Sequence, residues 1–279
     1  AAAAAFRANF VHGLAADGAL LEDVASQQKS FVAILVGIAV DKGVLDVDRS
    51  VGAYVGPGWS RASRDQEAAI AVSHLLEMTS GLRDDLTYEA APGARFHYNT
   101  PAYATLKPVL EAAAGQPLDA LTRAWLTEPA GMADTAWRPR PAAFADVGNP
   151  TGLVTTPRDI ARLGQLILDG GKTPDGLQVI SRAQLRSLLR PIPANPAYGR
   201  LWWINGSSYR IAPRVGDPRI EASLVPSAPA DLVAAMGAQD RKLYVVPSRG
   251  WVVVRTGQAA PDAGFDNQLW TRLMKAAPG

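Results

Sequence analysis

The sequence contains no cysteine and only three histidines, His12, His74 and His97. The absence of cysteine excludes disulfide bonds, thiolate metal sites and a cysteine nucleophile. None of the histidines has the spacing of a metal-ligand pair, so the sequence predicts no zinc site. We therefore expect no metal site. We also expect no cofactor.

The chain also lacks a strong charge of either sign. Its 28 Lys and Arg against 26 Asp and Glu give a formal net charge of +2, and no basic run is present. Without such a run we expect no nucleic-acid partner. No uninterrupted apolar stretch reaches about 18 residues, so we expect no membrane span, and the start shows no cleavable signal. A mature exported protein has the same appearance, and a periplasmic or secreted location is the prediction, with the cytoplasm as the alternative.

The most apolar segment is SQQKSFVAILVGIAVDKG, residues 26–43. It is apolar on nearly every face after Lys29 and ends in Gly43, which predicts a buried helix. Ser26 and Lys29 lie one turn apart at its start, where residues i and i+3 are neighbours. The simpler, structural interpretation is that Ser26 caps the helix. With 14 Ser and 6 Lys in the chain, S-x-x-K arises by chance about 0.3 times, so the motif alone is weak evidence.

Helical and strand patterns divide the rest of the chain. Helices are predicted within 70–78, in two parts of 92–132 separated at Gly115 and Pro117, after the cap Thr156, and at 265–277. Residues 242–257, KLYVVPSRGWVVVRTG, predict two short strands around a Ser-Arg-Gly turn. This order indicates an α+β fold in which an all-helical subdomain is inserted into an antiparallel-sheet subdomain.

Several further segments occur in the order of a known family. They are IAVSHLLEMTSGL, APGARFHYNTPAYATL, GQPLDALTRAWLTEPAGMADTAW, GLVTTPRDIARLGQLILDGG and YVVPSRGWVVVRTG. Together with the S-x-x-K segment, they make residues 23–275 resemble the serine β-lactamase-like hydrolases related to class C β-lactamases. That family includes penicillin-binding-protein-like esterases, D-amino-acid peptidases and nylon-oligomer amidases.

The resemblance implies the β-lactamase/transpeptidase-like fold as a single domain over 1–279. Its α/β part is expected at roughly 1–50 and 195–279, and its mainly helical part at roughly 51–194. Because relatives have a helix and two strands before the nucleophile, we expect strands from the first 25 residues to join the sheet of the 242–257 hairpin. Only 25 residues precede Ser26, so we also expect breaks in the chain there, with a trimmed sheet as the alternative.

The resemblance also assigns catalytic roles. Ser26 is the residue that is acylated, Lys29 is its base, and Tyr98 shuttles the proton. A lysine with an ordinary pKa near 10.4 is a poor base at neutral pH, so burial must lower the pKa of Lys29.

Two family elements are altered here. The Y-x-N element corresponds to Tyr98-Asn99-Thr100, which places Thr100 where the family has Asn and makes Asn99 and Thr100 candidate substrate-binding residues. The K-T-G or H-x-G element falls at Ala235-Met236-Gly237, without its cation. Gly237 is a candidate substrate contact, and the N–H groups of Ser26 and Ala238 are expected to form an oxyanion hole. A simple bend at Gly237 is the alternative.

The remaining candidates are two tryptophans and two histidines. Trp202 and Trp203 are candidates for a substrate pocket, with at least one of them expected in the core. His97 alternates with Tyr98 and is expected to face away from it. His74 is expected to be structural.

The function predicted is hydrolysis of a small ester or amide through an acyl-enzyme on Ser26. A penicillin-interactive β-lactamase or D,D-peptidase is the first alternative, and it ranks lower because the third element lacks its cation. An amidase for short linear oligomers is not separable from an esterase at this point. A catalytically inactive binding protein with the same fold is the alternative from a different class.

Overall fold

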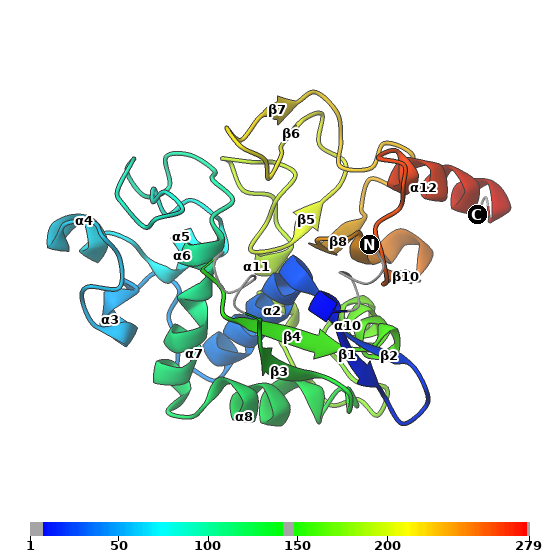
Figure 1. Ribbon diagram of the computed structural model, residues 1–279, viewed down its shortest axis with the longest axis horizontal. Coiled ribbons are helices and arrows are strands. Elements are labelled where there is room, and N and C mark those ends of the chain that lie inside the picture. The colour runs from blue at the N-terminus through cyan, green and yellow to red at the C-terminus, as the bar shows by residue number, and fades with distance from the viewer. Residues whose placement is uncertain (1–7, 142–147, 278–279) are drawn as a thin grey trace.

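The computed structural model describes residues 8–141 and 148–277. Helices flank two antiparallel sheets, which confirms the α+β class (Figure 1). No helix within these residues has the length and hydropathy needed to cross a bilayer. The helices are α2 (Gln28–Asp41), α3 (Gly52–Val55), α4 (Arg64–Ala68), α5 (Val72–Leu76), α6 (Thr100–Ala104), α7 (Leu106–Ala114), α8 (Leu118–Thr122), α10 (Pro157–Leu168), α11 (Arg182–Leu188) and α12 (Phe265–Ala276).

The strands form three antiparallel groups. The bounds are β1 (Val11–Leu14), β2 (Leu20–Asp23), β3 (Ala136–Pro139), β4 (Thr151–Thr155), β5 (Trp203–Ile204), β6 (Arg210–Ile211), β7 (Arg219–Ile220), β8 (Val233–Gly237), β9 (Arg241–Val246) and β10 (Trp251–Arg255). One sheet has the order β10-β9-β8-β5, a second has β1-β2-β4-β3, and β6 and β7 form a separate hairpin. The predicted hairpin at 242–257 is confirmed as β9 and β10.

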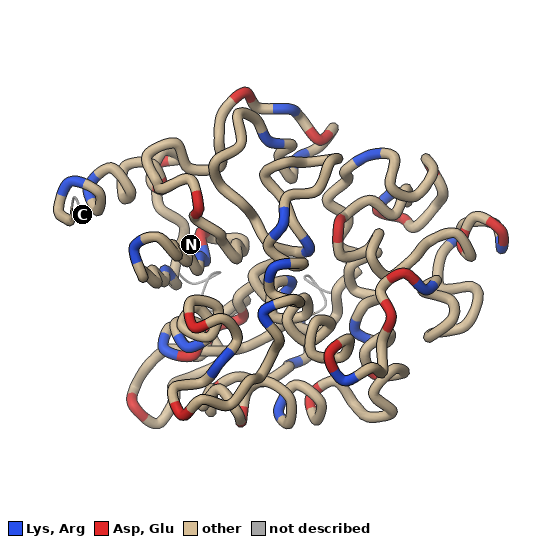
Figure 2. Tube along the Cα trace, turned by 180° about the vertical axis from the view of Figure 1, so that it is seen from behind, with Lys and Arg blue, Asp and Glu red and all other residues tan. Residues whose placement is uncertain are grey.

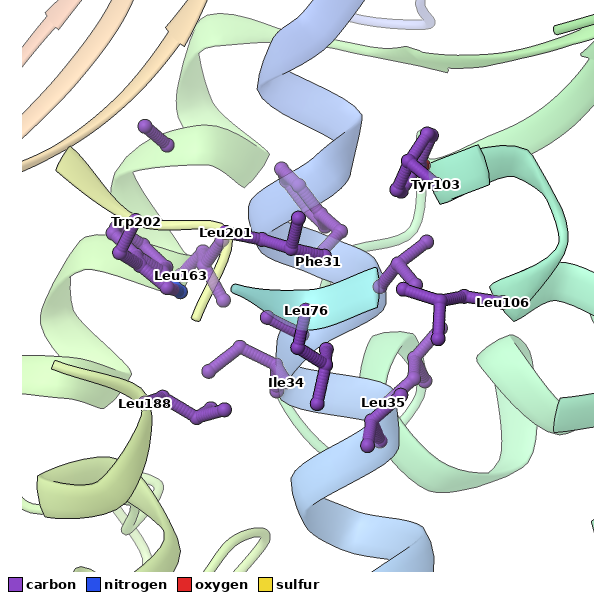
Figure 3. Close-up of a cluster of buried hydrophobic side chains, with 14 of the residues drawn as sticks. Phe31, Ile34, Leu35, Leu76, Tyr103, Leu106, Leu163, Leu188, Leu201 and Trp202 are labelled. Atoms are coloured by element: carbon purple, nitrogen blue, oxygen red, sulfur yellow. The ribbon is translucent and has the colours of Figure 1, made fainter. Parts of the chain in front are cut away.

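Helix α2 is the buried axis of the fold. Residues 28–39 are all buried, which matches a segment that is apolar on nearly every face. The predicted helix is confirmed, except that its first turn, Ala25–Gln27, is a 3-10 turn. Figure 3 shows α2 side chains surrounded by residues from other elements: Phe31, Ile34 and Leu35 lie among Leu76, Leu106, Leu163, Leu188, Leu201 and Trp202. Each such buried apolar side chain contributes about 1.5–3 kcal/mol.

The sheet that contains the hairpin is covered on both faces. Gly164 of α10 lies against Leu243 and Val252 on one face. Trp270 of α12 contacts the rings of Tyr244 and Trp251 on the other face. Successive side chains of β9 and β10 point to opposite faces of the sheet, so one set packs against α10 and the other against α12.

The prediction for the residues before Ser26 is wrong over 8–25, and residues 1–7 lie outside the described chain. Strands β1 and β2 do not join the hairpin's sheet, and the chain runs without interruption through residues 8–26. Instead, Glu22 and Asp23 of β2 pair with Thr155 and Val154 of β4. The sequence pattern had assigned no strand to β3 or β4, so the edge that accepts β2 was missing from the prediction. The division into parts at 1–50, 51–194 and 195–279 stays a prediction.

Gly164 provides a test of the contact between α10 and the hairpin. A Cβ at Gly164 would lie 2.5 Å from one methyl group of Val252, 3.1 Å from the other and 2.9 Å from a methyl group of Leu243, so the neighbours must shift to admit it. Gly164→Ala should therefore lower the free energy of unfolding by about 1–3 kcal/mol. Urea denaturation measures this change.

Gly52→Ala is the matched control. Gly52 is also helical, but an added Cβ there meets nothing within 4 Å. The free energy of unfolding should stay equal or rise by up to about 1 kcal/mol, because alanine favours the helix. Equal stability of the two variants would contradict the packing described for α10.

Candidate active site

The turn that carries Ser26 is held by Asp23. Asp23 Oδ1 accepts a hydrogen bond of 2.8 Å from the Ala25 N–H. Ala25 has φ of 51°, a left-handed conformation that is unfavourable for alanine and that marks local strain. Ser26 follows within the 3-10 turn, and its side chain borders a cavity of about 650 Å³. The strained turn thus presents the serine at the N-terminal end of α2.

Lys29 lies beside Ser26 in an almost dry environment. Its Nζ donates to Ser26 Oγ at 3.0 Å and to Thr100 Oγ1 at 3.2 Å. The amine also lies 4.9 Å from the ring centre of Tyr98 and 4.7 Å from that of Tyr103. Burial, together with the positive charge of Arg140, lowers the pKa of Lys29 to about 7. A large fraction of this amine is therefore uncharged at neutral pH.

Tyr98 completes a group of three around the serine. Burial raises the pKa of Tyr98 to about 12, and its hydrogen bond with Ser26 partly offsets that increase. The Tyr98 ring stacks on Trp203 with centres 6.0 Å apart and planes inclined by 23°. Tyr198 meets both rings edge-on, at 6.3 Å and 4.8 Å. The phenol is thus neutral and firmly oriented.

The two residues after Tyr98 have different environments. Asn99 is buried, and its amide donates to the Leu82 and Arg83 carbonyls and accepts from the Ala102 N–H that begins α6. The structure therefore does not place Asn99 as a substrate contact, because its amide is occupied by backbone groups. Thr100 instead contacts Lys29, in the position where the family has an asparagine.

Strand β8 lies directly against the serine turn. A Cβ at Gly237 would approach Val24 O to 2.2 Å and Gln27 N to 3.1 Å, so only glycine allows this contact. Gly237 and Ala238 border the same cavity as Ser26. Ala235 is fully buried, whereas Met236 faces the cavity, as does Lys242, its partner on β9.

The two adjacent tryptophans differ in their surroundings. Trp203 borders the cavity, and Trp202 is fully buried in the core (Figure 3). The candidate role of Trp202 in a pocket is therefore wrong, because its side chain alternates with that of Trp203. His97 contacts Asp217 at 2.8 Å, outside the cavity of Ser26, and His74 Nδ1 accepts from the Ala71 N–H.

A second, smaller cavity of about 250 Å³ reaches Ser26 and Lys29 from the side of β2 and β3. Arg140 lies in its wall and donates to both carboxylate oxygens of Asp23, at 2.7 and 2.8 Å. This buried pair anchors the residue that shapes the serine turn. The sequence pattern gave one signal for Asp23, an acidic residue two positions before a turn.

Lys107 is a second buried amine that the sequence analysis missed. Its Nζ donates to Asn149 Oδ1 at 2.6 Å and to the backbone and side-chain oxygens of Thr151, both at 2.8 Å. Burial, with the charges of Arg140 and Lys29, lowers the pKa of Lys107 to about 6. The available signal was a lysine on the apolar side of the 106–114 helix.

Comparisons with known proteins identify the family. Residues 4–277 match the Beta-lactamase family. The chain belongs to this family. Penicillin-binding protein 4 of Amycolatopsis lactamdurans is 28% identical over 204 residues, which are 57% of this chain and 53% of that protein. The chain thus spans about half the length of this curated relative.

Two solved structures illustrate the shared fold. A β-lactamase from Mycobacterium bovis has a TM-score of 0.67 at 21% identity, covering 92% of this chain and 86% of its own. A family VIII carboxylesterase has a TM-score of 0.66 at 13% identity, covering 91% and 83%. The β-lactamase/transpeptidase-like fold is therefore confirmed. The family and these neighbours are hydrolases, and the cellular location stays a prediction.

The lowered pKa of Lys29 predicts how stability varies with pH. The folded chain releases this proton near pH 7 and an unfolded lysine releases it near 10.5, so the unfolded state binds more protons between these values. The free energy of unfolding should therefore rise with pH in that range. From pH 7 to pH 9, wild type should gain on the order of 2 kcal/mol relative to Lys29→Met in urea denaturation.

Lys172→Met removes an exposed lysine and is the matched control. It should keep the pH dependence of wild type. If Lys29→Met keeps that dependence as well, Lys29 remains charged in the folded protein and the buried environment described here is incorrect.

Proposed function

We propose that this protein is a serine hydrolase that forms an acyl-enzyme on Ser26 and cleaves small esters or amides. The observation that carries the proposal is the contact of 3.0 Å between Lys29 Nζ and Ser26 Oγ. Lys29 has a pKa of about 7, and the Tyr98 hydroxyl bonds to the same serine. A hydroxyl nucleophile needs an adjacent base of this kind near neutral pH.

The chemistry follows from these positions. Neutral Lys29 takes the Ser26 proton, directly or through Tyr98, while Ser26 Oγ forms a bond to the substrate carbonyl carbon. The N–H groups of Ser26 and Ala238 stabilise the negative oxygen that develops. The bond to the leaving group then breaks and the leaving group receives the proton. Water repeats the sequence on the acyl-enzyme and releases the acid.

The lining of the cavity supports an ester or linear amide over a penicillin. Penicillin-recognising relatives are expected to hold the substrate carboxylate with a Lys or His at the position of Ala235. Ala235 is a small and fully buried side chain, so it offers no charge there. Lys242, the partner of Met236 on the neighbouring strand, is paired with Asp266 at 2.5 Å and with Asp240 at 3.5 Å. An inactive binding protein is disfavoured because all three reacting groups are retained.

The first test compares substrates. Short-chain p-nitrophenyl esters should be hydrolysed, with little or no turnover of nitrocefin, and Ser26→Ala should abolish the ester activity. Labelling with a fluorophosphonate, followed by peptide mass spectrometry, should locate the adduct on Ser26. Ser30→Ala is the matched control, because Ser30 is the neighbouring hydroxyl and donates to the Leu201 carbonyl. Wild-type rates in Ser26→Ala, or nitrocefin turnover faster than that of every ester, would refute the proposal.

The second test concerns the base. Because Lys29 must be neutral to accept a proton, kcat/KM for a neutral ester should rise with pH and level off above about 7. Lys29→Ala and Tyr98→Phe should each lower kcat by roughly 10²–10⁴-fold. His97→Ala should keep the rate for a neutral ester, because His97 lies outside this cavity. A rate that is independent of pH between 5 and 9 would exclude Lys29 as the base.

A further inference from the structure

The wall of the Ser26 cavity that faces strand β8 is supplied by the β6–β7 hairpin. Figure 1 shows this hairpin at the top of the molecule, above β5 and the N-terminal end of α2. Arg210 on β6 and Arg214 in the connecting loop both border the cavity that contains Ser26. The sequence analysis assigned no role to either arginine. Both signs of charge on the hairpin are visible in Figure 2.

These two arginines are the uncompensated charges of the cavity. Its carboxylates, Asp240 and Asp266, both contact Lys242, and Asp266 also accepts from a tyrosine hydroxyl. Arg210 bonds only through Nη1, to the carbonyls of Ala222 and Ser223 at 2.9 and 2.5 Å. Within residues 8–141 and 148–277, neither Arg210 nor Arg214 has a carboxylate partner. A site with two positive guanidinium groups favours an anionic ligand.

The hairpin is fixed in place over the site. Asp217, at the end of the same loop, contacts His97 at 2.8 Å, and His97 immediately precedes Tyr98 in the chain. The bonds of Arg210 to residues 222 and 223 secure the other side of the hairpin. Arg214 is exposed on this anchored loop. Burial of Arg210, together with the charge of Arg214, lowers the pKa of Arg210. Both guanidinium groups belong to residues that border one cavity, so both are placed to act on an anion bound there.

Apolar side chains border the same cavity as the arginines and the serine. They include Trp203, Ile220, Leu224 and Val225. A substrate in this cavity thus meets both apolar surface and positive charge. A hydrocarbon chain with an acidic end has this pattern.

We propose that this cavity selects esters or amides whose flexible chain carries a carboxylate away from the scissile bond, held by Arg214 with support from Arg210. The proposal rests on the proposed hydrolase function. It differs from penicillin recognition, in which the carboxylate is attached next to the scissile amide nitrogen and meets a cation on the β8 strand. Here the cation comes from the β6–β7 hairpin.

The test measures a substrate preference. We compare p-nitrophenyl hexanoate with mono(p-nitrophenyl) adipate, which carries the carboxylate on the acyl side. We also compare hexyl butyrate with 6-(butanoyloxy)hexanoate, which carries the carboxylate at the end of a flexible leaving group. Wild type should favour the anionic member of one pair in kcat/KM. Arg214→Ala should reduce that preference about tenfold, the scale of one charge-assisted contact, and Arg214→Lys should retain part of it.

Arg219→Ala is the matched control. Arg219 lies on the same hairpin, but it pairs with Glu221 and does not border the cavity. Its loss should leave the preference as in wild type, which separates a specific contact from a general change in charge. Added sodium chloride should reduce the preference in wild type more than in Arg214→Ala.

Three results are decisive. If wild type shows no preference in either pair, or if Arg214→Ala keeps the preference, the proposal is overturned. If neither neutral nor anionic esters show hydrolysis that depends on Ser26, the hydrolase function fails instead. Calorimetric binding of monomethyl adipate then decides the carboxylate site separately: Ser26→Ala should bind it more tightly than Ser26→Ala combined with Arg214→Ala, and equal binding would overturn the proposal.

Discussion

Burial of one amine next to one hydroxyl is the constraint on which the site depends. In water an amine with a pKa near 10.5 is charged at pH 7 and cannot accept a proton. The apolar surroundings of α2 disfavour the charged form of Lys29, and the positive charge of Arg140 adds to the effect. The same core residues that stabilise the fold therefore also set the protonation of Lys29, so stability and reactivity have a common origin.

The polar groups around this amine are arranged to compensate its burial. Thr100 and Ser26 give it hydrogen-bond acceptors, and the rings of Tyr98 and Tyr103 lie within cation–π distance. On the other side, the Asp23–Arg140 pair fixes the backbone before Ser26. Removal of one partner from such a buried pair leaves an uncompensated charge, which is costly. The site is thus supported by two separate polar clusters within an apolar core.

Some elements of the fold could be predicted from the sequence and others could not, and the reasons are physical. Helix α2 and the β9–β10 hairpin were predicted because their patterns are long and consistent. Strands were expected in the first 25 residues, but their partner was wrong, because β2 pairs with β4, which is distant in the sequence. Strands β3 and β4 were missed because they are only four and five residues long. Sequence motifs were enough to propose the catalytic residues Ser26, Lys29 and Tyr98. The third-element cation was judged absent, yet Lys242, Arg210 and Arg214 reach the cavity from other strands and loops, which no local pattern indicates.

The contact of Gly237 with the Ser26 turn has a consequence for how the protein is made. Ser26 lies near the start of the described chain and Gly237 near its end, so the two sides of the site are distant in sequence. Such contacts form late, because the entropy cost of closing a long loop comes before the contact contributes any stabilisation. During synthesis the serine therefore emerges well before the backbone that completes its surroundings. We expect the site to become competent only after this long-range contact has formed.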